Sequence, residues 1–155
     1  MGGACPRPDK KGTYKMSVPV HERSVSPQSF LLNAEKLEQL TNDLVMNDKY
    51  VPKKYRYVWT QEAFRLSMAI FENVRRANIL YPRDEETLKR RLFYLQTAET
   101  DSEALLTQIA FARNNFSISA GSLKEWEKLC IDTKNSIRRR RKDDFERFAK
   151  ELKRK

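Results

Sequence analysis

Apolar residues recur at intervals of three and four positions in four separate stretches of this chain, which is the spacing of an amphipathic α-helix. The first stretch, about residues 27–48, has Phe30, Leu37, Leu40, Leu44 and Val45 at this spacing. The second, about 54–80, has Ala63, Phe64, Met68, Phe71, Val74, Ala77 and Asn78. The third, about 84–117, has Leu88, Leu92, Leu95, Ala98, Leu105, Ile109, Ala112 and Phe116. The fourth starts at 122 and has Leu123, Trp126, Leu129, Cys130, Thr133 and Ile137. No stretch alternates apolar and polar residues, so we expect four helices and no sheet.

Helix-breaking and helix-capping residues stand between these stretches. The breakers are Pro27, Pro52, Pro82 and Gly121. Ser26 before Pro27 is a typical N-cap for the first helix, and Asp84 can cap the third. Ser122 and Glu125 match a capping box, in which two side chains bond reciprocally to backbone amides at a helix start. Four helices with short connections favour an all-α, antiparallel up-down-up-down four-helix bundle.

The glycines and prolines are concentrated near the N-terminus. Three of the 4 glycines and three of the 6 prolines lie in the first 25 residues of the 155. We therefore expect residues 1–25 to be a flexible tail and residues 26–155 to be the four-helix bundle with a basic end to its last helix.

The charge of the chain indicates a polyanionic partner. Lys and Arg total 31 against 21 Asp and Glu, and the formal net charge is +10. More than half of this excess lies in residues 138–155, where the apolar spacing is interrupted and resumes only at Phe145, Phe148 and Leu152. Nucleic acid is the first candidate for such a partner, and an anionic membrane surface is the second.

The first candidate nucleic-acid site is the run of basic residues in the last helix. It consists of Arg138, Arg139, Arg140, Arg141 and Lys142. Guanidinium groups bind phosphate well, and each contact releases a counterion. The alternative is a solvated helix end, in which these cations pair with Asp143, Asp144 and Glu146 at spacings of three and four residues.

The second candidate site lies where the first two helices join, and it interleaves cations with aromatic rings. The cations are Lys49, Lys53, Lys54 and Arg56, and the rings are Tyr50, Tyr55, Tyr57 and Trp59. Aromatic rings can stack on unpaired bases while cations hold the phosphates. The alternative is that these rings close the end of the core; of the tyrosines, we assign only Tyr55 to the candidate site with Lys53, Lys54 and Arg56.

Catalytic residues are scarce, so we expect no enzyme, no cofactor and no metal site. The one histidine, His21, lies outside the helical stretches, and the two cysteines, Cys5 and Cys130, have no metal-binding spacing. Glu99, Asp101 and Glu103 could be drawn as a metal or acid–base set, but Asp101 and Glu103 are two positions apart and should diverge on a helix, so we expect no such site. No stretch approaches the roughly 20 apolar residues of a membrane span. We therefore expect a cytoplasmic protein that does not act at a membrane.

Several short motifs together resemble a bacterial family of four-helix-bundle proteins. They are Val51–Tyr57 with Phe64, Ile70, Phe71, Val74 and Asn78; Leu105–Arg113; Ile118–Ser119; and the helix with Trp126 and Ile137. The family includes the accessory variability determinant (Avd) of diversity-generating retroelements and the proteins encoded in intervening sequences of ribosomal RNA genes. The likeness covers about 32–141, and Pro52–Arg56 is the stretch that most closely matches a family motif.

This resemblance implies a basic homo-oligomer, a pentamer, that binds a reverse transcriptase and its template RNA or cDNA and supports mutagenic copying without catalysing it. Relatives end the fourth helix with a small residue and a tryptophan, whereas this chain has Ile137–Arg141 there. The alternatives are an RNA-binding protein of the intervening-sequence type and a protein-interaction module whose basic helix docks on an acidic partner.

Overall fold

A computed structural model describes residues 28–154, and every long element in that range is an α-helix. The helices are α1 (Ser29–Val45), α2 (Gln61–Ile79), α3 (Glu85–Asn115) and α4 (Ala120–Leu152). No strand occurs within the described range, so the prediction of an all-α chain with four long helices is confirmed there. The flexible tail predicted for residues 1–25 and the cap predicted at Ser26 lie outside the described residues.

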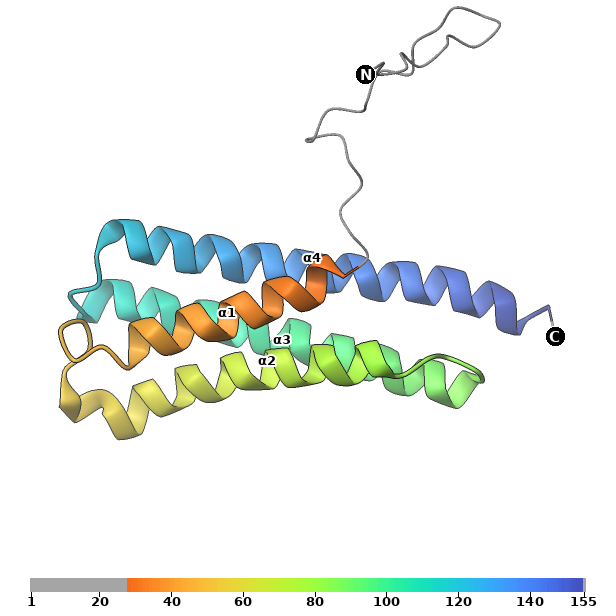
Figure 1. The fold of residues 1–155 in the computed structure, drawn as a ribbon, viewed down its shortest axis with the longest axis horizontal. Coiled ribbons are helices and arrows are strands. Elements are labelled where there is room, and N and C mark those ends of the chain that lie inside the picture. Colours follow the sequence, from red (N-terminus) through yellow and green to blue (C-terminus); the bar gives the residue numbers. More distant parts are fainter. Residues whose placement is uncertain (1–27, 155) are drawn as a thin grey trace, which may run out of the picture.

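The helices pack as a bundle around one core. Each helix contacts the next one in the chain, and α4 also contacts α1. In Figure 1 successive helices run in opposite directions, and the short α1 covers only part of the length of α3 and α4. The largest fully buried apolar side chains come from all four helices and include Phe30, Leu37, Leu66, Ile70, Leu95, Leu105, Ile109, Trp126 and Ile137. Trp126 also donates a hydrogen bond from Nε1 to Thr41 Oγ1 at 2.8 Å, which joins α4 to α1 inside the core.

The second helix begins differently from the prediction. Lys53–Tyr55 forms a turn of 3₁₀-helix and Arg56–Thr60 a turn of π-helix before α2 starts at Gln61. The buried face of α2 consists of Ala63, Leu66, Ser67, Ile70, Val74 and Ala77. The predicted face was therefore wrong in part, because Met68 and Asn78 are exposed. Two overlapping apolar stripes run along α2, and packing against α1 and α3 buries the one centred on Leu66 and Ile70.

The start of the fourth helix is also corrected. Gly121 does not break the chain but lies in the first turn of α4, and the capping box at Ser122 and Glu125 is not the helix start. The N-cap is Ser119, whose extended backbone lets its hydroxyl accept a hydrogen bond from the Ser122 amide at 3.1 Å. By contrast, the predicted cap at Asp84 is confirmed, since its carboxylate accepts hydrogen bonds from the amide and hydroxyl of Thr87 at 2.7 and 2.6 Å.

The C-terminal half of α4 runs beyond α1. Phe30, in the first turn of α1, lies beside Arg140 of α4. After Arg140, the described neighbours of α4 are α3 and the corner between α2 and α3. Phe148 is buried there and packs edge-on against Tyr81, with ring centroids 5.6 Å apart. None of the described helices is long and apolar enough to cross a membrane.

Candidate nucleic-acid interface

The predicted run of cations, Arg138 to Lys142, lies in the middle of α4 and turns around the helix. Successive residues of an α-helix are rotated by about 100°, so five consecutive side chains cannot share one face. Arg138, Arg139 and Lys142 are exposed, whereas Arg140 and Arg141 are half-buried. The run therefore divides into an outward set and a set that contributes to the packing of the bundle.

Arg140 belongs to the packed set. Its guanidinium carbon lies 5.5 Å from the centroid of the Phe30 ring on α1, a cation–π contact. Its Nε lies 3.2 Å from Asp144 Oδ1, although the two groups are not aligned as a hydrogen bond. These contacts point the Arg140 side chain toward the bundle and make it a poor candidate for binding phosphate.

Asp144 forms a buried ion pair that sequence reasoning missed. Arg91 Nε donates to Asp144 Oδ2 at 2.7 Å, and the side chains are 4% and 3% exposed. Arg91 also donates from Nη1 to the backbone carbonyls of Ala77 and Leu80. The pair thereby ties α4 to the α2–α3 corner. Asp144 lies seven residues after the buried Ile137, so the periodicity itself marks position 144 as inward-facing, even though its residue type suggests a solvent-exposed partner for Arg140.

Glu99 of α3 holds two of the remaining arginines. Arg138 Nε donates a hydrogen bond to Glu99 Oε1 at 2.7 Å, which raises the pKa of Arg138. Arg141 Nη2 lies 2.9 Å from Glu99 Oε2, but Oε2 accepts no aligned hydrogen bond. One carboxylate thus neutralises two guanidinium groups only in part. Lys142 is 3.9 Å from Glu146, and Arg139 has no ionic partner within residues 28–154.

Carboxylates near this run are fewer than cations. The cations are Arg91 and Arg138–Lys142, and the carboxylates are Glu99, Asp143, Asp144 and Glu146. The Lys142–Glu146 pair joins two exposed side chains and contributes about 0–1 kcal/mol, so a phosphate can displace it. Glu99 is only 13% exposed and keeps its aligned hydrogen bond to Arg138. Arg139 and Lys142, with the half-buried Arg141, are therefore the cations most available to an anionic ligand.

A shallow groove between α3 and α4 adds apolar surface to these cations. It is lined by Leu92, Gln96, Arg138, Arg141, Lys142 and Phe145. Phe145 is 58% exposed. We call these six lining residues the α3/α4 groove. Phe145 was not among the site residues predicted from sequence, although it had been recognised as an apolar position beyond the arginine run.

The second predicted cluster, around residues 49–59, has most of its rings turned into the core. Tyr55 packs edge-on against Phe116 with ring centroids 5.0 Å apart, and the Lys54 ammonium lies 5.2 Å from the Tyr55 centroid. Trp59 is buried against Phe116 and Trp126. Tyr55 and Trp59 therefore close this end of the core, as the alternative interpretation proposed.

Some cations of the second cluster form ion pairs with a carboxylate, and others do not. Arg56 donates to Asp48, and the Lys53 ammonium lies 3.8 Å from the same carboxylate. Lys54 is exposed and has no carboxylate partner among the described residues. Tyr57 is the ring that faces solvent, with 84% of its surface exposed, and it was named in the pattern but not among the site residues.

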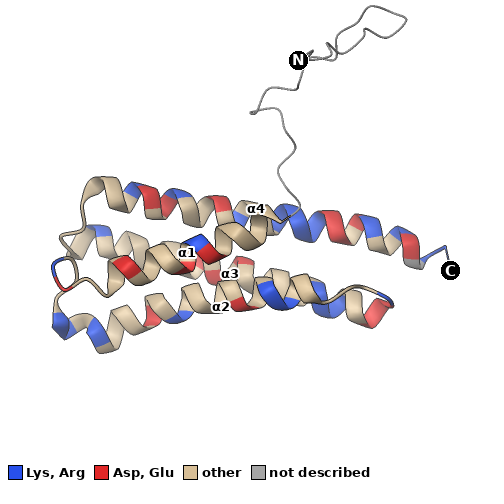
Figure 2. Cartoon of the chain, in the orientation of Figure 1, with Lys and Arg blue, Asp and Glu red and all other residues tan. Residues whose placement is uncertain are grey.

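The two predicted clusters do not form a single surface. Figure 2 shows one set of Lys and Arg where α1 joins α2 and another along the C-terminal half of α4, toward the opposite end of the bundle. Because α4 starts near the α1–α2 connection, Arg138 lies about 27 Å along the helix from Ala120. A nucleic acid would have to extend over most of the bundle to contact both clusters of one molecule.

Asp101 and Glu103 of α3 diverge, as predicted. Glu103 accepts a hydrogen bond from Lys134 of α4 at 2.9 Å, and Glu99 faces α4 as well, toward Arg138 and Arg141. Burial raises the pKa of Asp101, and the nearby charge of Arg65 on α2 acts in the opposite direction. Within residues 28–154 no three His, Cys, Asp or Glu side chains are grouped so that they could hold a metal ion.

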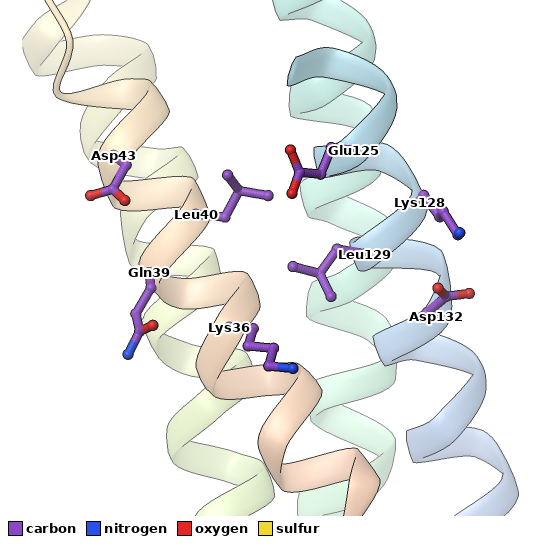
Figure 3. A pocket seen from close by; sticks show the side chains of 8 residues that line it. All are labelled: Lys36, Gln39, Leu40, Asp43, Glu125, Lys128, Leu129 and Asp132. Atoms are coloured by element: carbon purple, nitrogen blue, oxygen red, sulfur yellow. The ribbon is translucent and has the colours of Figure 1, made fainter. Parts of the chain in front are cut away.

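A groove between α1 and α4 has the opposite electrostatic character. Figure 3 shows Leu40 and Leu129 facing one another across it. Its other lining residues are Lys36, Gln39, Asp43, Glu125, Lys128 and Asp132. Carboxylates outnumber ammonium groups there, so this face disfavours a polyanion and leaves the α3/α4 groove as the better site.

Comparisons with known protein families, with curated proteins and with solved structures find no match to this chain.

Proposed function

We propose that this protein is a non-catalytic, nucleic-acid-binding accessory protein and that the α3/α4 groove is its principal contact surface. The observation that carries the proposal is the arrangement on α4, where Arg138, Arg141 and Lys142 line a groove in which cations outnumber carboxylates. Binding there would depend on backbone charge and on shape, so we expect little sequence preference.

The resemblance described above extends this proposal to a biological role. In that role the chain assembles into a homo-oligomer, a pentamer in the related proteins, in the cytoplasm. It binds the reverse transcriptase of a diversity-generating retroelement together with template RNA or cDNA. Repetition of a basic groove around an axis would multiply the number of phosphates that one assembly neutralises, which strengthens binding.

Binding at different salt concentrations tests the nucleic-acid proposal. The affinity for a labelled oligonucleotide should fall steeply between about 50 and 200 mM salt, because each phosphate contact on a single strand adds about 0.7 to the slope of log K against log salt. The variant Arg138→Gln/Arg139→Gln/Lys142→Gln removes three exposed charges and should lower that slope by up to about 2. Arg140 is left unchanged because it packs on Phe30.

A matched variant at the other end of the bundle locates the site. Lys49→Gln/Lys53→Gln/Lys54→Gln removes the same number of exposed charges from the α1–α2 connection and should reduce the slope less. Circular dichroism should show equal helicity for both variants. Affinity that does not change with salt, or that survives both substitutions, would contradict the proposal.

The role in a retroelement is tested separately. The genomic region that encodes this chain should contain a reverse transcriptase gene and a pair of near-identical repeats, and the two proteins should purify together. A protein that binds nucleic acid but whose gene has no such neighbours would instead fit the intervening-sequence type of relative.

A protein-interaction module is a second candidate, favoured by the apolar surface of Leu92 and Phe145 between the cations. An acidic helix with an apolar stripe could use both features. Under this alternative, binding would require a folded partner, and oligonucleotides would not compete with it.

A further inference from the structure

The α3/α4 groove differs from the other two grooves described on the bundle because it combines a phenylalanine with an excess of cations. The α1/α4 groove has only leucines as its large apolar residues, and carboxylates predominate in it. The groove lined by Met68, Phe71 and Arg75 contains two carboxylates, Glu38 and Glu72, for its one cation. Burial and the neighbouring Glu35 raise the pKa of Glu38, a sign that this face accommodates negative charge poorly.

The lining residues that α4 contributes to the α3/α4 groove form one stripe on that helix. Arg138, Arg141, Lys142 and Phe145 follow at spacings of three, one and three residues, so they lie along the same side of the helix over about 10 Å. The phenylalanine stands at one end of the stripe and the cations continue from it.

An exposed ring beside cations distinguishes between the two forms of nucleic acid. A duplex presents phosphates on its outside and keeps the faces of its bases stacked within it, so a phenylalanine on a helix surface finds no base face to contact. A single strand exposes those faces, and stacking on an aromatic ring is a main source of affinity for single strands. A short stripe of mixed aromatic and cationic character therefore matches a single strand.

The ion pairs in the groove leave cations that can turn to phosphate. Arg138 keeps an aligned hydrogen bond to Glu99, whereas the contact of Arg141 with the same carboxylate is not aligned. Lys142 is 75% exposed and 3.9 Å from its acidic neighbour. Arg141 and Lys142 can thus bind phosphate while Arg138 continues to neutralise Glu99.

We infer that the α3/α4 groove binds single-stranded nucleic acid, with an unpaired base stacked on Phe145 and the adjoining phosphates held by Arg141 and Lys142. This inference rests on the proposed nucleic-acid-binding function and specifies its ligand.

The test compares strands with duplexes in variants that keep every charge. An oligouridylate of about 12 nucleotides and a duplex RNA of the same length serve as probes, within the usual range of single-strand site sizes. Phe145→Ala and Phe145→Leu should each weaken binding of the single strand at least about fivefold, because one stacking contact is lost. Duplex affinity should stay within about twofold, and the salt slope should not change, because no charge is removed. Tyr57→Ala, which removes the exposed ring at the other end of the bundle, is the matched control and should have no effect.

A spectroscopic variant tests stacking directly. Phe145→Trp introduces an exposed indole, whereas Trp59 and Trp126 are buried in the core. Binding of the oligouridylate should quench the fluorescence of this variant and leave that of the parent protein nearly unchanged. Absence of quenching in a variant that binds with parental affinity would overturn the stacking assignment.

The remaining outcomes separate this inference from the proposed function. Suppose that the glutamine variant at Arg138, Arg139 and Lys142 weakens binding, whereas Phe145→Ala weakens binding of the single strand and the duplex equally or weakens neither. In that case the proposed function stands and the inference about stacking is wrong. If Tyr57→Ala weakens single-strand binding more than Phe145→Ala does, the stacking site lies at the other end. If a polyglutamate peptide of equal charge competes as well as the oligouridylate, the groove recognises charge alone. If the protein binds no oligonucleotide, both proposals fail.

Discussion

The two halves of α4 are held to the bundle by different kinds of interaction. Residues 120–137 bury an apolar stripe that includes Trp126, Cys130 and Ile137, and they contact both α1 and α3. Among residues 138–151, whose side chains the structure describes, Phe148 is the one buried apolar residue, and this half depends on the ion pair between Arg91 and Asp144. The first half is packed by hydrophobic contact, and the second is positioned by charge.

This difference explains how the candidate interface can be both basic and ordered. A helix end rich in cations buries little apolar surface, so hydrophobic contact alone would leave it weakly attached. The buried Arg91–Asp144 pair, together with the contacts of Glu99, fixes the orientation of α4 there. Those contacts consume some of the positive charge, and the outward residues retain the rest.

The largest effect is expected in the first half. Trp126→Ala removes the largest fully buried side chain and leaves the buried Thr41 hydroxyl without its donor. We expect it to lower the free energy of unfolding by about 3–5 kcal/mol, the usual cost of removing a large buried side chain. Urea denaturation followed by circular dichroism measures this loss. Ile131→Ala, a substitution at a partly exposed position of the same half, serves as the control and should cost far less.

Breaking the buried ion pair of the second half of α4 should lower the free energy of unfolding by nearly as much. Asp144→Asn leaves Arg91 charged and buried without its carboxylate, which typically costs about 3 kcal/mol or more. Asp143→Asn, the exposed neighbour, is the matched control and should change stability by less than about 0.5 kcal/mol. The double variant Arg91→Met/Asp144→Leu should recover part of the loss, because the buried guanidinium is removed together with its carboxylate. The recovery should be incomplete, because Arg140 and the carbonyls of Ala77 and Leu80 lose their partners.

Thiol labelling shows whether the Asp144→Asn loss is local. Burial raises the pKa of Cys130 to about 12, so its thiol should react slowly with iodoacetamide at pH 8 while the first half of α4 is packed. In a Cys5→Ser background, Trp126→Ala should expose Cys130 to labelling much more than Asp144→Asn does. Equal labelling of the two variants would show that both halves of α4 open together, which would contradict the view that different interactions hold the two halves.

A smaller effect on stability is expected at the corner between α2 and α3, against which the second half of α4 packs. Hydrogen bonds from the hydroxyl and then from the amide of Thr87 hold the pKa of Asp84 below its usual value of 3.8. The ionised cap therefore stabilises the folded state above about pH 4, and this contribution disappears as the pH falls through the lowered pKa. Asp84→Asn keeps a capping side chain without the charge. The stability difference between the parent and this variant, measured by urea denaturation from pH 6 to pH 2.5, should shrink below about pH 4; a difference that does not change with pH would refute the role of the charge.

Some features of the site could have been found from the sequence and others could not. The basic run and the aromatic cluster are visible as composition, but Tyr55 and Tyr57, two positions apart, have opposite environments in the structure. The 3₁₀ and π turns that precede α2 decide which ring faces Phe116 and which faces solvent. A helical wheel assumes uniform α-geometry and cannot make that distinction.

The sequence by itself determined the four helices, the Asp84 cap and the apolar stripe of the first half of α4, because helical periodicity and capping are local properties. Only the tertiary structure decided which cations stay free. Arg91 and Asp144 are 53 positions apart in the chain, and Glu99 is 39 positions from Arg138. Ion pairs over such separations depend on how α3 lies against α4, so the spacing of charges along one helix cannot reveal them.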